Sequence, residues 1–289
     1  MLARDRPPAP ARQRGGWQTG RVSSENVTGA DERDTAPQFV LPLVVRIEKA
    51  APPARTDALE TAARAVLVML SDERSTGDGP WARAVRDWED ARIRKVVRRA
   101  RGAEWRRAAL LPGVTVTGEE AEVRVFPPVP LDGWPKDLAR LQVSGTELDD
   151  PAVPPPPAPG GAVLWLNPEL RMSAGKEMAQ AGHGAQLLWW ALDGAARAAW
   201  REAGFPLAVR TALPGRWAEL VASGRPVVRD AGFTEIAPGS ATVVSDFTPA
   251  AAAPPERPGT SGAAPAGTPA GATAGAPAAS DAERPAPPA

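Results

Sequence analysis

Two stretches of the chain match each other at a constant spacing. Trp88 and Trp105 recur as Trp200 and Trp217, each 112 positions later, and WEDARIRKVVRRARGAEW lies over WREAGFPLAVRTALPGRW without a gap. Each stretch follows a short apolar run and an alanine-rich helical pattern. We therefore expect a tandem of two related α/β units. The alternative is a coincidence of composition in a chain rich in alanine and arginine.

Both apolar runs, VLPLVVRI from Val40 and AVLWL from Ala162, are brief and bounded by Pro or Gly, which is typical of buried strands. Strands that alternate with helices favour a sheet with helices packed on it. For the second unit we expect, in order, a strand at 163–167, a helix at 173–202, a strand at 207–211, a helix at 216–222, and strands at 226–229 and 241–245.

The composition changes sharply along the chain. Residues 248–289 contain no Val, Ile, Leu, Phe or Trp, so they have no apolar surface to offset the entropy of ordering, and we expect a disordered tail. Residues 1–37, rich in Pro, Arg and Gly, are expected to form a second one. The Pro-rich linker DDPAVPPPPAPGG at 149–161 separates the two expected units, 38–148 and 162–247.

The overall composition excludes several classes of protein. The chain has no cysteine, which rules out disulfides, thiolate metal sites and a cysteine nucleophile. Its formal net charge is zero. No apolar run approaches the roughly 18 residues that a membrane span needs, and the first residues lack the apolar core of a secretion signal. We expect a soluble, cytoplasmic protein that does not bind membranes.

The start of the second unit predicts an anion site. Ser173 is suited to cap the helix that follows the strand, and Gly175 and Lys176 then fall in its first turn. Free backbone N–H groups, the positive end of the helix dipole and a lysine ammonium all favour a negatively charged ligand.

Lys176, Gln180 and His183 are spaced to share one face of this helix, beside the apolar stripe that packs on the sheet. A lysine in a first turn is often only solvated, and a lone histidine is often structural. For His183 we keep two interpretations, a packing role and a contact with catalytic groups or RNA.

A second group of polar residues lies between Pro226 and Val244. Asp230 follows a strand, Thr234 lies on the next loop, and Pro238-Gly239 turns the chain into the last strand. If the strands of Val163 and Val227 are parallel, Lys176 and Asp230 meet at their carboxyl edge, where open α/β sheets bind ligands. Alternatively, Asp230 caps its own turn and Thr234 is an ordinary loop hydroxyl.

Both motifs together resemble the archaeal and eukaryotic type (type 2) of peptidyl-tRNA hydrolase. The resemblance covers about 85 residues, Val163 to Phe247, and consists of Met-x-x-Gly-Lys-x-x-x-Gln-x-x-His followed by Arg-Asp-Ala-Gly-x-Thr-x-Ile-Ala-Pro-Gly-Ser. It implies a mixed four-stranded sheet flanked by helices. It also implies cleavage, without metal or cofactor, of the ester between a peptide and the tRNA 3′ ribose. The implied active-site residues are Lys176, Asp230 and Thr234, with Gly175, Gln180 and His183 beside the substrate.

The sequence departs from the family pattern at the rim of the site. The first strand ends Leu-Asn-Pro-Glu-Leu, where the family has Val-Arg-x-Asp-Leu, and Phe233 stands where Arg is frequent. The alternative function is therefore a catalytically weak or inactive module that binds RNA or a protein partner. The residue types do not decide which group is the general base.

The first unit keeps the scaffold but lacks the chemistry. Its helix, TDALETAARAVLVML, has no Gly-Lys, Gln or His, and Gly118 aligns with Asp230. We expect it to be catalytically inactive and to stand in the place of a second protomer. It carries a basic cluster that is either a solvated face or a phosphate-binding surface for tRNA. We assign substrate binding to Arg94, Arg98 and Arg101 within the full cluster of Arg92, Arg94, Lys95, Arg98, Arg99, Arg101, Arg106 and Arg107.

Overall fold

A computed structural model of the chain describes residues 37–158, 160–230 and 236–248. Apart from Pro37 and Thr248, the two expected tails lie outside these ranges. No helix in the described ranges is long and apolar enough to cross a membrane.

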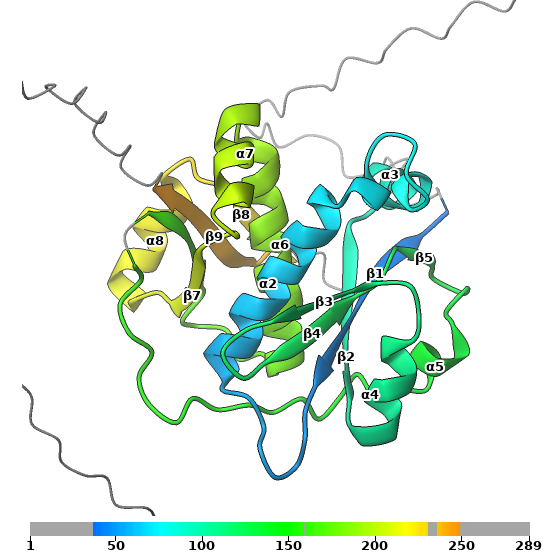
Figure 1. The fold of residues 1–289 in the computed structure, drawn as a ribbon. Helices are drawn as coiled ribbons and strands as arrows, with labels where there is room; N and C mark the ends of the chain where they lie inside the picture. Colours follow the sequence, from blue (N-terminus) through cyan, green and yellow to red (C-terminus); the bar gives the residue numbers. More distant parts are fainter. Residues whose placement is uncertain (1–36, 159, 231–235, 249–289) are drawn as a thin grey trace, which may run out of the picture. The chain divides into compact units, whose positions relative to one another are not determined.

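Two mixed sheets with the same topology form the framework, as expected for an α/β tandem (Figure 1). In each sheet the first two strands are parallel, and the last two strands pair antiparallel. A short extra strand, β5 (Val129–Pro130), pairs with β1. The first sheet has the order β2 (Arg94–Ala100), β1 (Phe39–Arg46), β4 (Glu122–Val125), β3 (Val114–Thr117), and the second β7 (Leu207–Thr211), β6 (Gly161–Leu166), β9 (Ala241–Thr248), β8 (Val227–Arg229).

Three helices of each repeat occur in corresponding places. The first repeat contains α2 (Arg55–Ser71), the short 3₁₀ helix η1 (Glu73–Ser75), α3 (Ala82–Asp90), α4 (Gly102–Ala109) and α5 (Lys136–Ala139). The second contains α6 (Ala174–Ala191), α7 (Gly194–Glu202) and α8 (Pro214–Ala222). Two short helices of the first repeat, η1 and α5, have no counterpart in the second.

The expected single helix at 173–202 is wrong, because it is two helices. Leu192 has an extended backbone that ends α6. Asp193 then caps α7, and its carboxylate accepts a hydrogen bond from the N–H of Ala196 at 2.8 Å. A capping side chain at this point favours a new helix start over continuation of the old one.

The matched tryptophans make the same hydrogen bond in both halves. The indole N–H of Trp88 donates to the carbonyl of Arg94 at 2.8 Å, and that of Trp200 donates to the carbonyl of Pro206 at 3.0 Å. Donor and acceptor are both displaced by the spacing seen in the sequence. Coincidence of composition does not explain a conserved hydrogen bond between the same two positions of each repeat.

The two repeats share one hydrophobic core. Its centre is the contact between α2 and α6, which lie side by side (Figure 1). Glycines make this packing possible, because a Cβ on Gly182 would lie 2.9 Å from Val66 and one on Gly184 would lie 2.8 Å from Val243. Helix α6 is therefore held tightly between the α2 helix of one repeat and the β9 strand of its own.

Candidate active site at the carboxyl edge of the second sheet

The strands of the second sheet bring the two sequence motifs together. Strands β6 and β8 are both antiparallel to β9 and hence parallel to each other. Strand β6 leads into α6, which carries Lys176, and β8 leads directly into Asp230. As predicted, the two side chains meet: Lys176 Nζ lies 3.5 Å from Asp230 Oδ2, with 14% and 9% of the side chains exposed.

A chain of two hydrogen bonds, from Thr242 to Gln180 and from Gln180 to Asp230, holds the Asp230 carboxylate. The Gln180 amide donates to Asp230 Oδ2 at 2.9 Å. The other end of this amide, Oε1, accepts from the hydroxyl of the fully buried Thr242 at 2.7 Å. A carboxylate only accepts, so the NH₂ end of the amide faces Asp230, and the hydroxyl of Thr242 donates to the oxygen at the other end. This chain of hydrogen bonds orients Asp230. Sequence reasoning missed Thr242, which lies on the last strand, outside both motifs.

The ammonium of Lys176 keeps donor capacity for a ligand. Its nitrogen is buried and makes no hydrogen bond to the residues that the structure describes. A lysine ammonium carries three donors, and the ion pair with Asp230 is longer than a hydrogen bond. An acceptor oxygen beside Lys176 would therefore satisfy a buried donor at a site that already holds a carboxylate.

The backbone of Asp230 closes the base of the loop that follows. Its N–H donates to the carbonyl of Ser240 at 3.0 Å, and its carbonyl accepts from the N–H of Gly239 at 2.7 Å. Gly239 has φ +81, a conformation that glycine adopts without strain. Thr234 belongs to this loop but lies outside the described residues, as does Phe233.

The expected anion site at the start of α6 needs a correction. Ser173 caps the helix as predicted, accepting from the N–H of Lys176 at 3.4 Å. However, the N–H of Ala174 donates to the carbonyl of Thr146 at 3.1 Å. A Cβ on Gly175 would approach Thr146 to 3.3 Å, so this glycine is explained by close packing. Two of the first-turn amides are thus satisfied inside the protein, and the lysine remains the main anion-binding group.

His183 lies against the first repeat instead of joining Lys176 and Asp230. Its Nδ1 is 3.2 Å from the ammonium nitrogen of Lys95, which also donates to Gln186 at 2.5 Å. Burial lowers the pKa of His183 well below its usual value, and the charge of Lys95 lowers it further. Burial likewise lowers the pKa of Lys95, against the opposing effect of Glu89. These contacts favour the packing interpretation of His183.

The basic cluster does not form one continuous face. Along β2, successive side chains point to opposite sides of the sheet, so Lys95 is buried against α6 whereas Arg98 lies on the other side. Arg98 stacks on Trp134 at 4.3 Å and donates to the carbonyls of Ala139 and Leu141. Burial lowers the pKa of Arg98. Of the three arginines assigned to substrate binding, Arg98 is thus occupied within the protein, Arg94 begins β2, and Arg101 is exposed before α4.

The corresponding place in the first repeat is filled by Asp57. Its carboxylate accepts from three backbone N–H groups, those of Glu119 at 3.0 Å and of Glu120 and Ala121 at 2.7 Å. A Cβ on Gly118 would lie 2.1 Å from Asp57 Oδ1, so an aspartate there would clash. The acid here lies on α2 instead of the loop and holds the turn together through backbone N–H groups.

Among the described residues, no three His, Asp or Glu side chains lie close enough to hold a metal ion. No protein-family model matches the chain, and no curated protein matches it in sequence.

Proposed function

We propose that the second repeat hydrolyses the ester between a peptide, or another N-blocked amino acid, and the 3′ ribose of tRNA. The observation that carries this proposal is the buried ion pair of Lys176 and Asp230 at the carboxyl edge of the sheet. The pair joins the two motifs that resemble type 2 peptidyl-tRNA hydrolases, and the sheet around it is mixed and four-stranded, as this resemblance implies.

The charges of the pair suit acyl transfer to water. The ammonium of Lys176 donates to the ester carbonyl and stabilises the negative charge that develops on its oxygen. Asp230 holds the ammonium in place and offers a carboxylate that accepts a proton from the attacking water. The water oxygen bonds to the carbonyl carbon and the bond to the ribose oxygen breaks. The ribose oxygen takes up the proton that Asp230 accepted from the water, so that the ribose leaves as a hydroxyl and Asp230 is a carboxylate again.

A turnover assay on an N-acetylated aminoacyl-tRNA tests the proposal. We expect the native chain to release the amino acid, and Lys176→Ala and Asp230→Ala each to reduce kcat/KM by at least about 100-fold, the scale of a lost oxyanion donor or general base. Lys136→Ala and Asp246→Ala are matched controls, because Lys136 is exposed on α5 and Asp246 pairs with Arg225 away from the site.

The possible outcomes separate hydrolysis from binding. Native turnover that both site variants lose and both controls keep supports the hydrolase. Tight binding of the same tRNA without turnover would instead support the alternative, a binding module with the hydrolase fold. Turnover that survives in either site variant, with an unchanged melting curve, would refute the assignment of the pair.

A further inference from the structure

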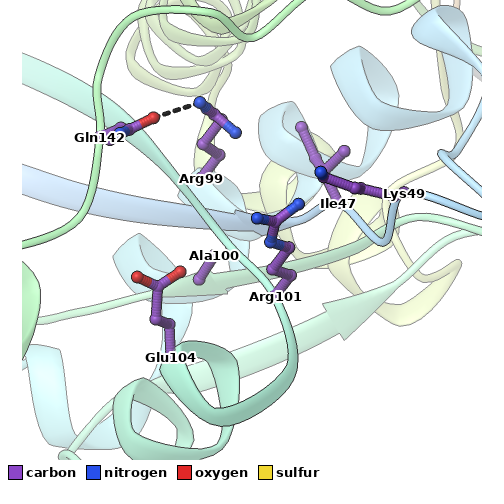
Figure 2. A pocket seen from close by; sticks show the side chains of 7 residues that line it. All are labelled: Ile47, Lys49, Arg99, Ala100, Arg101, Glu104 and Gln142. Atoms are coloured by element: carbon purple, nitrogen blue, oxygen red, sulfur yellow. Dashed lines mark hydrogen bonds between the residues drawn. The ribbon is translucent and has the colours of Figure 1, made fainter.

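A cavity lies just beyond the carboxyl ends of the parallel strands β1 and β2, in the first repeat. Its volume is about 330 Å³. Ile47 follows β1, and its N–H donates to the carbonyl of Ala100, the last residue of β2. The carboxyl ends of strands are the usual place for ligands in open α/β sheets. The cavity is lined by Ile47, Lys49, Arg99, Ala100, Arg101, Glu104 and Gln142 (Figure 2).

The charge of the lining is mainly positive. Lys49, Arg99 and Arg101 contribute three cations, against the single carboxylate of Glu104. In Figure 2 the charged ends of the three cations point toward the same space, whereas Glu104 lies to one side on α4. The nearby carboxylate of Glu48 accepts from Arg46 at 3.1 Å and from the N–H of Gly102 at 3.0 Å, and it also interacts with the charge of Arg101. Because Arg46 pairs with Glu48 at the same time, the surroundings of the cavity keep an excess of positive charge.

Arg99 is held in place without being neutralised. Its guanidinium donates to the carbonyl of Ser144 at 3.1 Å and to the amide oxygen of Gln142 (Figure 2). Gly145, with φ +71, lets the chain turn around it, and a Cβ there would lie 3.4 Å from Arg99. Both acceptors are uncharged, so the fixed guanidinium retains its positive charge and has further N–H donors for a ligand.

We propose that this cavity binds the phosphate group of a nucleotide. Planar guanidinium groups bind phosphate oxygens with two hydrogen bonds, and a nearby ammonium adds charge. The volume falls within the range of about 300–1,000 Å³ that is usual for small-molecule sites. The apolar side chains of Ile47 and Ala100 also line the cavity and offer a surface for the ribose. The nucleotide is either free or part of an RNA strand, and this site does not depend on hydrolysis at Lys176.

Calorimetric titration of the full chain tests the site, with 5′-CMP, cytidine and a single-stranded RNA octamer as probes. We expect 5′-CMP to bind at least 10-fold more tightly than cytidine. The double variant Lys49→Gln with Arg101→Gln should weaken 5′-CMP binding by at least 10-fold. Arg99 stays unchanged in this variant, because it also anchors the segment at Ser144.

The matched control is Arg106→Gln with Lys136→Gln, which removes the same charge from exposed positions outside the cavity. This control variant should change the affinity for 5′-CMP by less than about 2-fold. If the octamer binds 10-fold more tightly than 5′-CMP, and the cavity variant lowers its salt slope by about 1.4 (two contacts at roughly 0.7 each), the nucleotide belongs to an RNA strand. Equal affinities would identify a free nucleotide.

Three results would overturn the proposal: no binding of 5′-CMP or the octamer, equal affinity for 5′-CMP and cytidine, or equal weakening by the cavity and control variants. The Lys176→Ala chain separates this site from the proposed hydrolase. It should bind 5′-CMP like the native chain, whether or not the native chain shows turnover.

Discussion

Thr242 shows how a residue outside both motifs controls one inside them. Its hydroxyl donates to Gln180, and Gln180 donates to Asp230. The sequence places Gln180 on the same helical face as Lys176, which correctly predicts their common position. It gives no sign of Thr242, because a threonine in a strand is most simply explained by β-propensity.

We predict that Thr242→Val impairs both stability and rate. The substitution leaves the buried Gln180 oxygen without its short hydrogen bond, which costs about 1–3 kcal/mol. It also frees the amide to rotate away from Asp230, so kcat should fall about 10-fold with little change in KM. Thr242→Ser should restore kcat, because it keeps the hydroxyl. Equal kcat values for the Thr242→Val and Thr242→Ser variants, measured on N-acetylated aminoacyl-tRNA, would show that Thr242 only fills space.

His183 makes the stability depend on pH in a defined direction. Its pKa is lowered in the folded protein by burial and by Lys95, so the unfolded chain binds more protons below pH 6.5. The free energy of unfolding should therefore fall as the pH drops from 6.5, with a slope approaching about 1.4 kcal/mol per pH unit. Denaturant titrations between pH 5 and 7 should show this loss, and His183→Gln should reduce it. An identical slope in the variant would contradict the role of His183.

At the scale of elements, the sequence predicts helix starts and strands better than it predicts contacts between segments that are far apart in the chain. The two strands before the long helices and the Ser173 cap follow from local patterns. The contact of Thr146 with the first turn of α6 does not, because these segments are far apart in the chain. Asp193 is a local N-cap signal for a second helix. We gave more weight to the alanine-rich pattern on both sides of it and therefore predicted one continuous helix.

We predict that Gly184→Ala destabilises the protein although alanine favours helices. The added Cβ would lie 2.8 Å from the buried Val243, and overpacking a core costs about 1–3 kcal/mol. The gain in helix propensity is roughly 1 kcal/mol, so we expect a net loss of about 1 kcal/mol. Gly194→Ala is the control, because open space surrounds its Cβ. Equal melting temperatures for the two variants would contradict tight packing of α6 on β9.

At the scale of the whole described part of the chain, the repeats are joined by charged contacts as well as by their shared core. Arg55 of α2 forms a two-point ion pair with Glu177 of α6, at 2.7 and 2.6 Å. Glu60 of α2 accepts from the N–H of Val209 at 3.1 Å and from Arg210 at 2.6 Å. Because β7 is an edge strand of the second sheet, Glu60 satisfies a backbone donor that the sheet leaves unpaired.

We therefore predict that Glu60→Ala destabilises the chain by about 2 kcal/mol, since it leaves the N–H of Val209 without its acceptor and removes the carboxylate that pairs with Arg210, which keeps only carbonyl acceptors such as Pro155. Glu219→Ala, at an exposed position on α8, should change the free energy of unfolding by less than about 0.5 kcal/mol. Urea titration of both variants measures the difference. Equal stabilities would mean that Glu60 is not needed to join the repeats.

The sequence spacing predicted the tandem and a first copy without the catalytic residues, but not what stands in their place. Gly118 signals the loss of the acid in the first repeat. The replacement of that acid by Asp57 became visible only when helix and turn were seen together. The basic cluster was likewise read from sequence spacing alone. The alternation of β2 places Lys95 in the core and Arg98 on the opposite face of the sheet, whereas Arg99 and Arg101 line the cavity at the end of the strand.

The central claim is that Lys176 and Asp230 act as one catalytic unit. A double-mutant cycle under single-turnover conditions, with the native chain, Lys176→Ala, Asp230→Ala and the double variant acting on N-acetylated aminoacyl-tRNA, measures this directly. Residues that act as a unit give strongly non-additive losses, so we predict that the double variant is within about 3-fold of the slower single variant. Losses that multiply in the double variant, or native turnover no faster than the buffer reaction, would contradict the claim.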